Sequence, residues 1–241
     1  MVFGTVLDQV DGGRRRLVFY NVKERGEHTE RVIEYVSSHD VDLEYVDDPA
    51  EPNSTVAVEA GDRRLASDDV EQVSAYIDSW ETALSTDRRP PSIFEALDET
   101  VFRSTNKRQL ILASRLVETR AMRAGEGRLA AGFQQLSLAR PQLTFYKQLP
   151  STITVSLYGE PDWLPPADSG IEAYDPGVES HADYWWVLFD NTDTPSQHAA
   201  LVAEENPDNT YTGFWTYRES LVEAISEIVD GFGARRLVAD E

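Results

Sequence analysis

The residues of this chain whose types and spacing could do chemistry lie mainly between positions 107 and 135, and Arg115 and Glu118 are the first of them. An arginine and a glutamate three positions apart on a helix can pair across one turn. On the helix expected here they share a face with Ile111 and Met122, and the neighbouring face is apolar as well. Both charges are therefore expected close to the core. There the pair would be either a structural ion pair or part of the wall of a ligand cavity.

Phe133 and Gln134 are further candidates for ligand binding, on a short strand expected over residues 129–134. The primary amide of Gln134 offers a donor and an acceptor, which suits ligand recognition and the edge of a strand equally. Glu204 is another candidate because it ends an apolar strand-like run. It is expected to point inward, whereas Glu205 is expected to face water. A buried carboxylate beside an arginine would keep its charge.

Aromatic residues crowd the C-terminal half, and Tyr158 and Trp215 are the candidates among them. Alternation along the expected strand 211–217 places Trp215 and Phe214 on opposite faces. Most of these rings are expected in the core. A tryptophan and tyrosine set near a buried Arg–Glu pair could nevertheless line a pocket for a flat ligand.

Other kinds of site have little support in the sequence. Gly125, Gly127 and Gly132 follow a helix and precede a strand, whereas the glycines of a phosphate-binding loop lie between a strand and a helix N-terminus. Gly125 is better explained as a left-handed helix terminator. The 4 histidines show no metal-ligand spacing, and no Gly-x-Ser-x-Gly motif is present. No metal, cofactor or catalytic residue is predicted.

The composition is that of an acidic, folded protein. Of the 241 residues, 41% are hydrophobic, and 43 Asp and Glu stand against 22 Lys and Arg, for a formal net charge of -21. The positive charge is carried almost wholly by arginine. This balance indicates adaptation to high salt, and an ordinary acidic cytosolic protein is the alternative. The absence of cysteine excludes disulfides and thiolate metal sites.

The same features bear on partners and location. Nucleic-acid binding needs a clustered basic face, but the arginine pairs of this chain are short and dispersed, so no direct contact with nucleic acid is expected. The N-terminus shows no basic segment followed by an apolar run, and no stretch reaches the ~18 apolar residues that span a bilayer. No membrane contact is expected, and the protein is expected in the cytoplasm.

The elements that must position these residues alternate between strands and helices, which predicts an α/β protein with a mixed β-sheet flanked by helices. Residues 1–84 are predicted to form a small N-terminal β-α-β-β-α unit, whose last helix could be capped by Ser67 or Asp68. Residues 85–92 contain two prolines and are predicted to be a linker. Residues 93–241 are then predicted to form the second domain.

The second domain is predicted to begin with a short helix near residue 93 and to continue with the long helix from residue 107. The stretch 136–149 is expected to be helical and interrupted by Pro141. Four strands follow, and a closing helix is expected over residues 219–230.

Several separated motifs of this second region resemble the DICT sensory domain, a family named for its occurrence with diguanylate cyclases and two-component systems. The motifs are SRLVETRAMRAGEGRLAAGFQQLS, YGEPDW, LVAEEN and GFWTYRESLV, in that order. By this resemblance, the region is a sensory or regulatory module and not an enzyme. The positions that the motifs carry over are Arg115, Glu118, Gln134, Tyr158, Glu204 and Trp215.

The resemblance implies a module that binds a small-molecule signal and passes it on by protein contact. No kinase, cyclase or helix-turn-helix region is evident, so the output would be a separate signalling protein, namely a kinase, a cyclase or a transcription regulator. The protein could also form a homodimer. A sensor predicts a closed pocket around the long helix. A pure interaction or scaffold module predicts a filled core and an exposed apolar patch, and an enzyme, the third alternative, predicts polar side chains converging in an open cleft.

Overall fold

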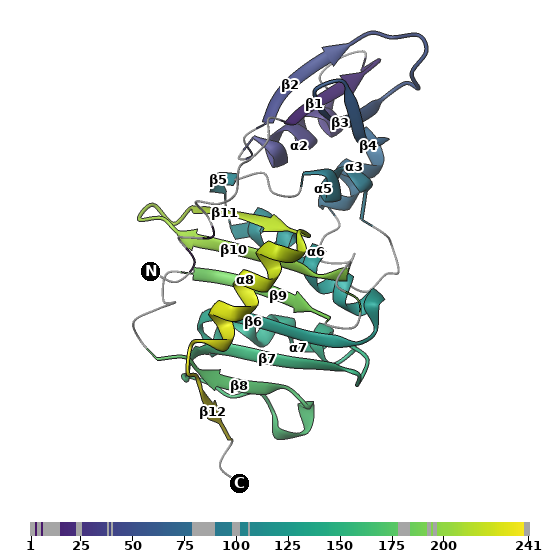
Figure 1. Ribbon diagram of the computed structural model, residues 1–241. Helices are drawn as coiled ribbons and strands as arrows, with labels where there is room; N and C mark the ends of the chain where they lie inside the picture. The colour runs from purple at the N-terminus through teal and green to yellow at the C-terminus, as the bar shows by residue number, and fades with distance from the viewer. Residues whose placement is uncertain are drawn as a thin grey trace.

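The structure is a computed structural model of the chain. It describes residues 3, 6, 15–22, 26–37, 39, 41–78, 90–97, 102–105, 107–177, 184–191, 194 and 197–238. A smaller and a larger β-sheet, each with its helices, lie at opposite ends of an elongated molecule (Figure 1). The α/β class and the mixed sheet flanked by helices are confirmed.

The smaller sheet belongs to the N-terminal part of the chain. Its elements in chain order are β1 (Arg15–Tyr20), α2 (Glu27–Val36), β2 (Val41–Val46), β3 (Thr55–Ala60), β4 (Arg63–Asp69) and α3 (Val70–Asp78). Among the described residues the strand order is β2-β1-β3-β4, with β1 and β2 parallel and the other neighbours antiparallel. The predicted N-terminal β-α-β-β-α unit is present, and a hairpin that turns at Gly61 adds β4 to it.

The larger sheet collects the strands of the rest of the chain. Its elements and the helices around it are α5 (Ser92–Ala96), β5 (Phe102–Thr105), α6 (Lys107–Ala124), β6 (Gly127–Gln135), η1 (Leu136–Gln142), α7 (Leu143–Tyr146), β7 (Ile153–Glu160), η2 (Ala167–Ser169), β8 (Glu172–Asp175), β9 (Tyr184–Asp190), β10 (Ala199–Glu205), β11 (Tyr211–Thr216), α8 (Glu219–Asp230) and β12 (Arg235–Leu237). The strand order in the described residues is β12-β8-β7-β6-β9-β10-β11-β5. Strands β6, β7 and β8 run parallel, and the remaining neighbours are antiparallel.

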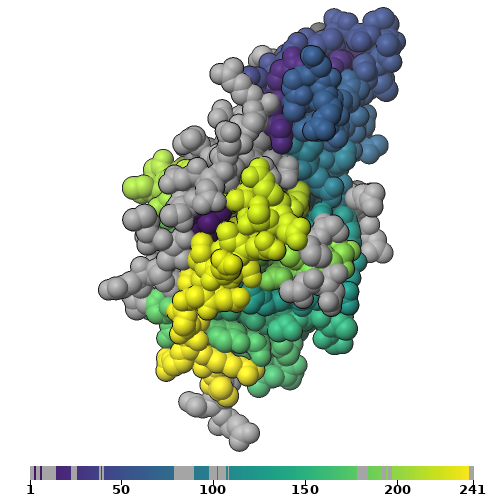
Figure 2. Space-filling view, in the orientation of Figure 1, coloured from purple at the N-terminus to yellow at the C-terminus, as the bar shows by residue number. Residues whose placement is uncertain are grey.

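Helices cover both faces of the larger sheet. Alternation along β6 sends Leu129 and Ala131 into the cluster that contains the apolar side of α6, and Ala130 into the cluster that contains Ile225 of α8. Figure 2 shows α8 lying across the face that is turned to the viewer. Because β9 and β10 are buried on both sides, their central residues are almost continuously apolar.

The two sheets share one core. The cluster that holds α6 also contains Leu17 and Phe19 of β1, and His39 forms an isolated β-bridge with Phe102. Helix α5 follows the predicted linker and packs against β3 and β4 of the smaller sheet. Of the linker itself, residues 85–89 lie outside the described part of the chain, so the predicted domain boundary stays a prediction.

Two acidic residues cap the helices next to this boundary. Asp69 Oδ1 accepts a hydrogen bond from the Gln72 amide at 3.0 Å and so caps α3. Asp68, which the sequence offered as the cap of α3, instead accepts from the Ile93 amide at 2.8 Å and from the Ser92 hydroxyl at 3.0 Å. The prediction was wrong by one residue because β4 continues to Asp69.

The long helix α6 ends as predicted. Gly125 takes a φ of 79°, and its amide donates to the Ala121 carbonyl at 3.1 Å, so the glycine is a left-handed terminator. The stretch after β6 is helical as expected, but it is divided into the 3₁₀ helix η1, which includes Pro141, and the short helix α7. None of the described helices combines the length and the apolar character that a membrane crossing requires.

Candidate functional site

The ion pair between Arg115 and Glu118 is present and buried. The residues are 4% and 2% exposed, and Arg115 Nη1 donates to Glu118 Oε2. The other carboxylate oxygen accepts a hydrogen bond of 2.8 Å from the Tyr146 hydroxyl. The guanidinium also lies 5.5 Å from the centroid of the Phe145 ring. The predicted pairing across one helical turn is therefore confirmed, and α7 supplies two aromatic neighbours.

Burial keeps the Tyr146 hydroxyl protonated. Desolvation is the main cause that raises the pKa of Tyr146 well above its usual value, and the adjacent carboxylate of Glu118 raises it further. The hydroxyl is thus a permanent donor to Glu118 at any ordinary pH. Each charge of the pair has a specific partner, as buried charges require.

A cavity of about 450 Å³ lies next to this pair. It is bounded by the first half of α6, the end of β6, η1, and the starts of β9 and β11. The described residues that line it are Lys107, Ile111, Arg115, Phe133, Gln134, Ser137, Leu138, Pro141, Gln142, Tyr184, Trp185 and Tyr211. Rings and aliphatic chains make up most of this wall, and the polar groups are few.

Three buried polar atoms of the wall have no hydrogen-bond partner among the described residues: Arg115 Nε, Gln142 Oε1 and Trp185 Nε1. Gln142 is 8% exposed, and Arg115 is still more deeply buried. Buried polar groups in native proteins are almost always paired, so a group left over calls for an explanation. These atoms belong to residues that line the cavity, but each has almost no accessible surface, so they lie behind the wall and do not face the cavity space.

The η1 wall of the cavity is anchored from outside. Asp162 Oδ1 accepts from the Ser137 amide at 2.9 Å, and hydrogen bonds from Ser137 lower the pKa of Asp162. Arg140 lies 5.1 Å from the ring centroid of Trp163. These contacts hold η1 against the loop after β7. The position of this wall is therefore fixed from outside the cavity as well.

The candidates chosen from sequence divide into two groups. Arg115, Phe133 and Gln134 line the cavity, and Glu118 lies behind Arg115 without lining it. Gln134 Nε2 donates to Glu205 Oε2 and so fixes a carboxylate near the cavity.

Tyr158 and Trp215 lie elsewhere. Tyr158 is on the α8 side of the sheet, where its ring stacks on Tyr174 with centroids 5.0 Å apart. Trp215 belongs to the core near the smaller sheet, and it contacts Phe102 and His39 at centroid distances of 6.0 and 5.0 Å. Neither ring lines the cavity.

The expectation for Glu204 was wrong. Glu204 is exposed, whereas Ala203 before it is buried and Glu205 after it is half-buried. Alternation along β10 puts Glu204 on the same face as the buried Val202, so the burial of that face ends between these two residues.

Gln142, Trp185, Tyr211 and Lys107 belong to the cavity but were not chosen from the sequence. Gln142 follows Pro141 in a 3₁₀ helix, where no regular period marks an inward face. Trp185 stands beside Trp186, and alternation shows that the two indoles point to opposite faces without showing which one reaches a cavity.

A larger hollow of about 1240 Å³ lies between α3, α5 and the end of α6. Its lining includes charges of both signs, and three of them, Asp68, Asp69 and Arg120, have partners close by. Asp68 and Asp69 cap helices, and Arg120 donates to the Gln197 carbonyl at 3.0 Å while lying 4.5 Å from the Tyr217 ring centroid. Among the described residues, no group of three or more His, Asp and Glu side chains gathers as metal ligands.

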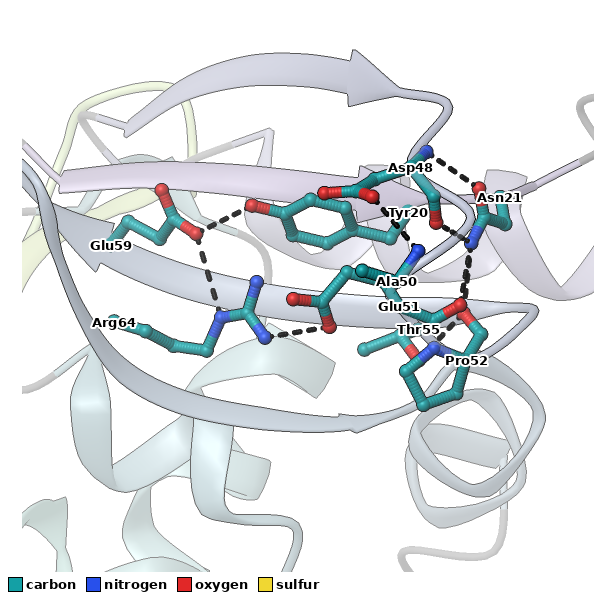
Figure 3. A network of polar contacts seen from close by, with 9 residues as sticks. All are labelled: Tyr20, Asn21, Asp48, Ala50, Glu51, Pro52, Thr55, Glu59 and Arg64. Carbon is teal, nitrogen blue, oxygen red and sulfur yellow. Dashed lines mark hydrogen bonds and ion pairs between the residues drawn. The ribbon is translucent and has the colours of Figure 1, made fainter.

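A polar network covers the outer face of the smaller sheet (Figure 3). Glu59 accepts a hydrogen bond of 2.8 Å from the Tyr20 hydroxyl and pairs with Arg64, whose Nη1 donates to Glu51 at 2.8 Å. Asn21, at a φ of 51°, donates to the carbonyls of Asp48 and Glu51 at 2.7 and 2.8 Å. The side chains satisfy one another, so the network ties the loop after β2 to the sheet.

No family model matches the chain, and no characterised protein matches it in sequence. Among solved structures, the crystal structure of polyphosphate kinase from Porphyromonas gingivalis is similar, with 11% identity and a TM-score of 0.36 over 98% of this chain and 50% of that chain. This chain thus spans half the length of that protein. At such a TM-score the likeness carries no argument about function.

Proposed function

We propose that this protein is a non-enzymatic sensory module that binds a small-molecule signal in the cavity beside Arg115 and passes the signal to another protein by contact. The cavity carries the proposal. Its volume of about 450 Å³ lies within the range of roughly 300–1,000 Å³ common for small-molecule sites. Its wall combines aromatic and aliphatic side chains with a few polar ones, a composition common in such sites.

The resemblance to the DICT sensory domain supports the same function. It rests on motifs alone, since no family model matches. Three of the positions that those motifs single out, Arg115, Glu118 and Gln134, lie at or directly behind the cavity wall.

Helix α6 offers a route for the signal. Its residues Lys107, Ile111 and Arg115 line the cavity, and Gln109 on the same helix donates hydrogen bonds of 3.0 Å to the carbonyls of Glu34 and Tyr35. These carbonyls lie in the last turn of α2. A ligand that shifts the start of α6 would therefore act on α2 through a direct contact.

The output surface is proposed on β2, which follows α2 and pairs within the described sheet only with β1. Leu43 and Tyr45 on this edge strand are 42% and 44% exposed. An exposed apolar edge is a common place for another chain to add. The proposed partner is a kinase, cyclase or transcription regulator acting as a separate chain, with a second copy of this chain as the alternative.

The same edge favours a second candidate function, a scaffold module without a ligand. Such a module would use the apolar pair Leu43 and Tyr45, and its cavity would be incidental. The two candidate functions differ in one respect: the sensor requires a ligand in the cavity, and the scaffold does not.

Native mass spectrometry of the protein purified from its own cells in high salt separates them. A sensor is expected to carry a mass excess that denaturation releases as a small molecule. Leu138 lines the cavity and is 41% exposed. A tryptophan at this position can therefore fill the cavity in Leu138→Trp without forcing a larger ring into the packed hydrophobic core. Leu138→Trp is expected to remove the mass excess. Leu43→Trp, at a position of similar exposure on the smaller sheet, is expected to retain it.

The scaffold function is favoured by the opposite pattern. The unmodified protein and both variants would then show the mass of the chain alone. Capture of a partner protein would be lost with Leu43→Trp but retained with Leu138→Trp.

A further inference from the structure

Resting on the proposed function, we infer that the ligand of this cavity is an uncharged aromatic molecule that is held by apolar contact. The charges of the wall are the first observation. Among the described lining residues, only Lys107 and Arg115 carry a formal charge. Arg115 donates to Glu118 directly behind it, and Tyr146 donates to the same carboxylate. The buried pair is neutral as a unit, so it offers a ligand no uncompensated charge.

The other charges near the cavity lie close to water. Lys107 is exposed at the start of α6, so its long side chain can keep the ammonium group in solvent. Glu205 is half-buried, stands outside the described lining, and accepts the hydrogen bond that Gln134 donates. Burial, with Glu205 as the second cause, raises the pKa of Tyr211, so this phenol of the wall stays neutral at ordinary pH.

The unpaired polar atoms of the wall offer a charged ligand nothing either. Arg115 Nε, Gln142 Oε1 and Trp185 Nε1 have almost no accessible surface. An anion or a cation in the cavity would therefore lose its hydration without meeting a free partner of opposite charge in the described wall. Moving a charge out of water in this way is strongly unfavourable, and an uncharged ligand avoids the penalty.

The rings of the wall define the rest of the ligand. Phe133 and Trp185 lie with centroids 6.0 Å apart, and Trp185 and Tyr211 stand edge to face at 6.3 Å. Tyr184 also contributes to the wall. A flat ring gains from offset and edge contacts with such side chains, whereas a saturated ring gains from burial alone. The volume of about 450 Å³ is large enough for a bicyclic aromatic molecule.

Calorimetric titration at neutral pH tests this class with four probes of similar size: uncharged 2-naphthol, anionic 2-naphthoate, cationic 2-naphthylmethylammonium and the saturated alcohol decahydro-2-naphthol. The protein is first freed of any retained molecule, and high salt is kept constant. 2-Naphthol is expected to bind at least about ten-fold tighter than either ion, because the ions lose hydration without a partner. The saturated alcohol is expected to bind about three-fold more weakly than 2-naphthol, since it lacks the ring contacts.

A matched pair of variants tests the charge preference at the wall itself. Ile111 lines the cavity and is half-buried, so Ile111→Glu adds a carboxylate to the wall. This variant is expected to weaken 2-naphthol about ten-fold and to make 2-naphthylmethylammonium the tightest probe. Ile228→Glu adds the same group at a half-buried helical position on α8, across the sheet, and is expected to leave the order of the probes unchanged.

Two variants at exposed positions keep the test independent of folding in Ile111→Glu. Lys107→Gln is expected to change the affinity of every probe less than about two-fold, because the ammonium lies in solvent. Leu138→Trp is expected to weaken 2-naphthol at least about ten-fold by filling the cavity. Binding of 2-naphthol that survives Leu138→Trp would lie outside the cavity and would overturn the inference.

The remaining outcomes also decide the ligand class. Either ion binding as tightly as 2-naphthol, or no binding by any probe, would overturn the uncharged class. Decahydro-2-naphthol binding as tightly as 2-naphthol would overturn the aromatic class. The proposed function is tested separately by the mass excess of the purified protein: a charged molecule released on denaturation, and absent from Leu138→Trp, would leave the sensor standing and overturn only this inference.

Discussion

Tyr146 donates a hydrogen bond of 2.8 Å to Glu118 Oε1 from a helix 28 positions further along the chain, and this contact joins α7 to α6 behind the cavity. Because Arg115 occupies the other oxygen of Glu118, the three side chains form one buried network. The first prediction concerns its stability. Tyr146→Phe is expected to cost about 1.5–3 kcal/mol, the usual value of a hydrogen bond to a charged group. Glu118→Gln, which leaves the Arg115 charge unpaired, is expected to cost about 3–5 kcal/mol.

Urea unfolding of the variants measures both costs, with the exposed Glu223→Gln on α8 as the control. Replacing both charges by apolar residues, in Arg115→Met with Glu118→Leu, is expected to recover most of the loss. If Glu118→Gln were no more damaging than Glu223→Gln, the ion pair would not be buried as described.

The second prediction concerns coupling between the cavity and the smaller sheet. Gln109→Leu removes the donor to the Glu34 and Tyr35 carbonyls. Ligand-dependent protection from hydrogen exchange in α2 is then expected to disappear, with ligand affinity changed less than about two-fold, since Gln109 does not line the cavity. Gln72→Leu on α3, an exposed helical glutamine, is the control. Protection of α2 that survives Gln109→Leu would place the route elsewhere.

The third prediction concerns pH. Burial of His39 against Tyr35, Phe102 and Trp215 lowers its pKa from 6.5 to about 4. The folded state thus resists a proton that the unfolded state accepts, so this contribution to stability is complete above about pH 6.5 and is lost as the pH falls toward 4. The loss is expected to reach about 3 kcal/mol.

Unfolding midpoints between pH 7 and pH 4 check this dependence. His39→Phe is expected to flatten that part of the profile, and the exposed His28→Gln to leave it unchanged. A wild-type profile that stays level through the window would show that His39 is solvated.

The fourth prediction concerns Gly132 of β6. A Cβ at this position would lie 1.9 Å from Nε1 of Trp186, a side chain that is 1% exposed. Gly132→Ala is therefore expected to destabilise by about 1–3 kcal/mol, as overpacking does. Gly26→Ala, where a Cβ meets nothing within 4 Å, is expected to be neutral. Thermal melts compare the two, and Trp186→Leu combined with Gly132→Ala is expected to regain part of the loss.

The sequence was sufficient for the parts of the site that lie on long periodic elements. A period of 3.6 placed Arg115 and Glu118 on a single buried face of α6, and the strand after Gly125 brought Phe133 and Gln134 next to them. Local periodicity and turn chemistry determine these features, so no tertiary information was needed.

The rest of the site depends on which face of each element meets a neighbour. Tyr158 and Trp215 are buried aromatics as expected, but β7 turns Tyr158 toward α8, and β11 turns Trp215 toward the smaller sheet. Glu204 differs from Glu205 by one residue, and a shift of one residue reverses the face. Gln142 and Trp185 enter the wall only because η1 and β9 meet beside α6, a packing relation that no local pattern encodes.

A crystal structure of the protein purified from its own cells, without any step that strips bound molecules, tests the central claim most directly. Our interpretation predicts density for a non-protein molecule in the cavity, in contact with the side chains that line it. A cavity that is closed by side chains, or that holds only ordered water while a partner strand lies along β2, would contradict the sensor and favour the scaffold.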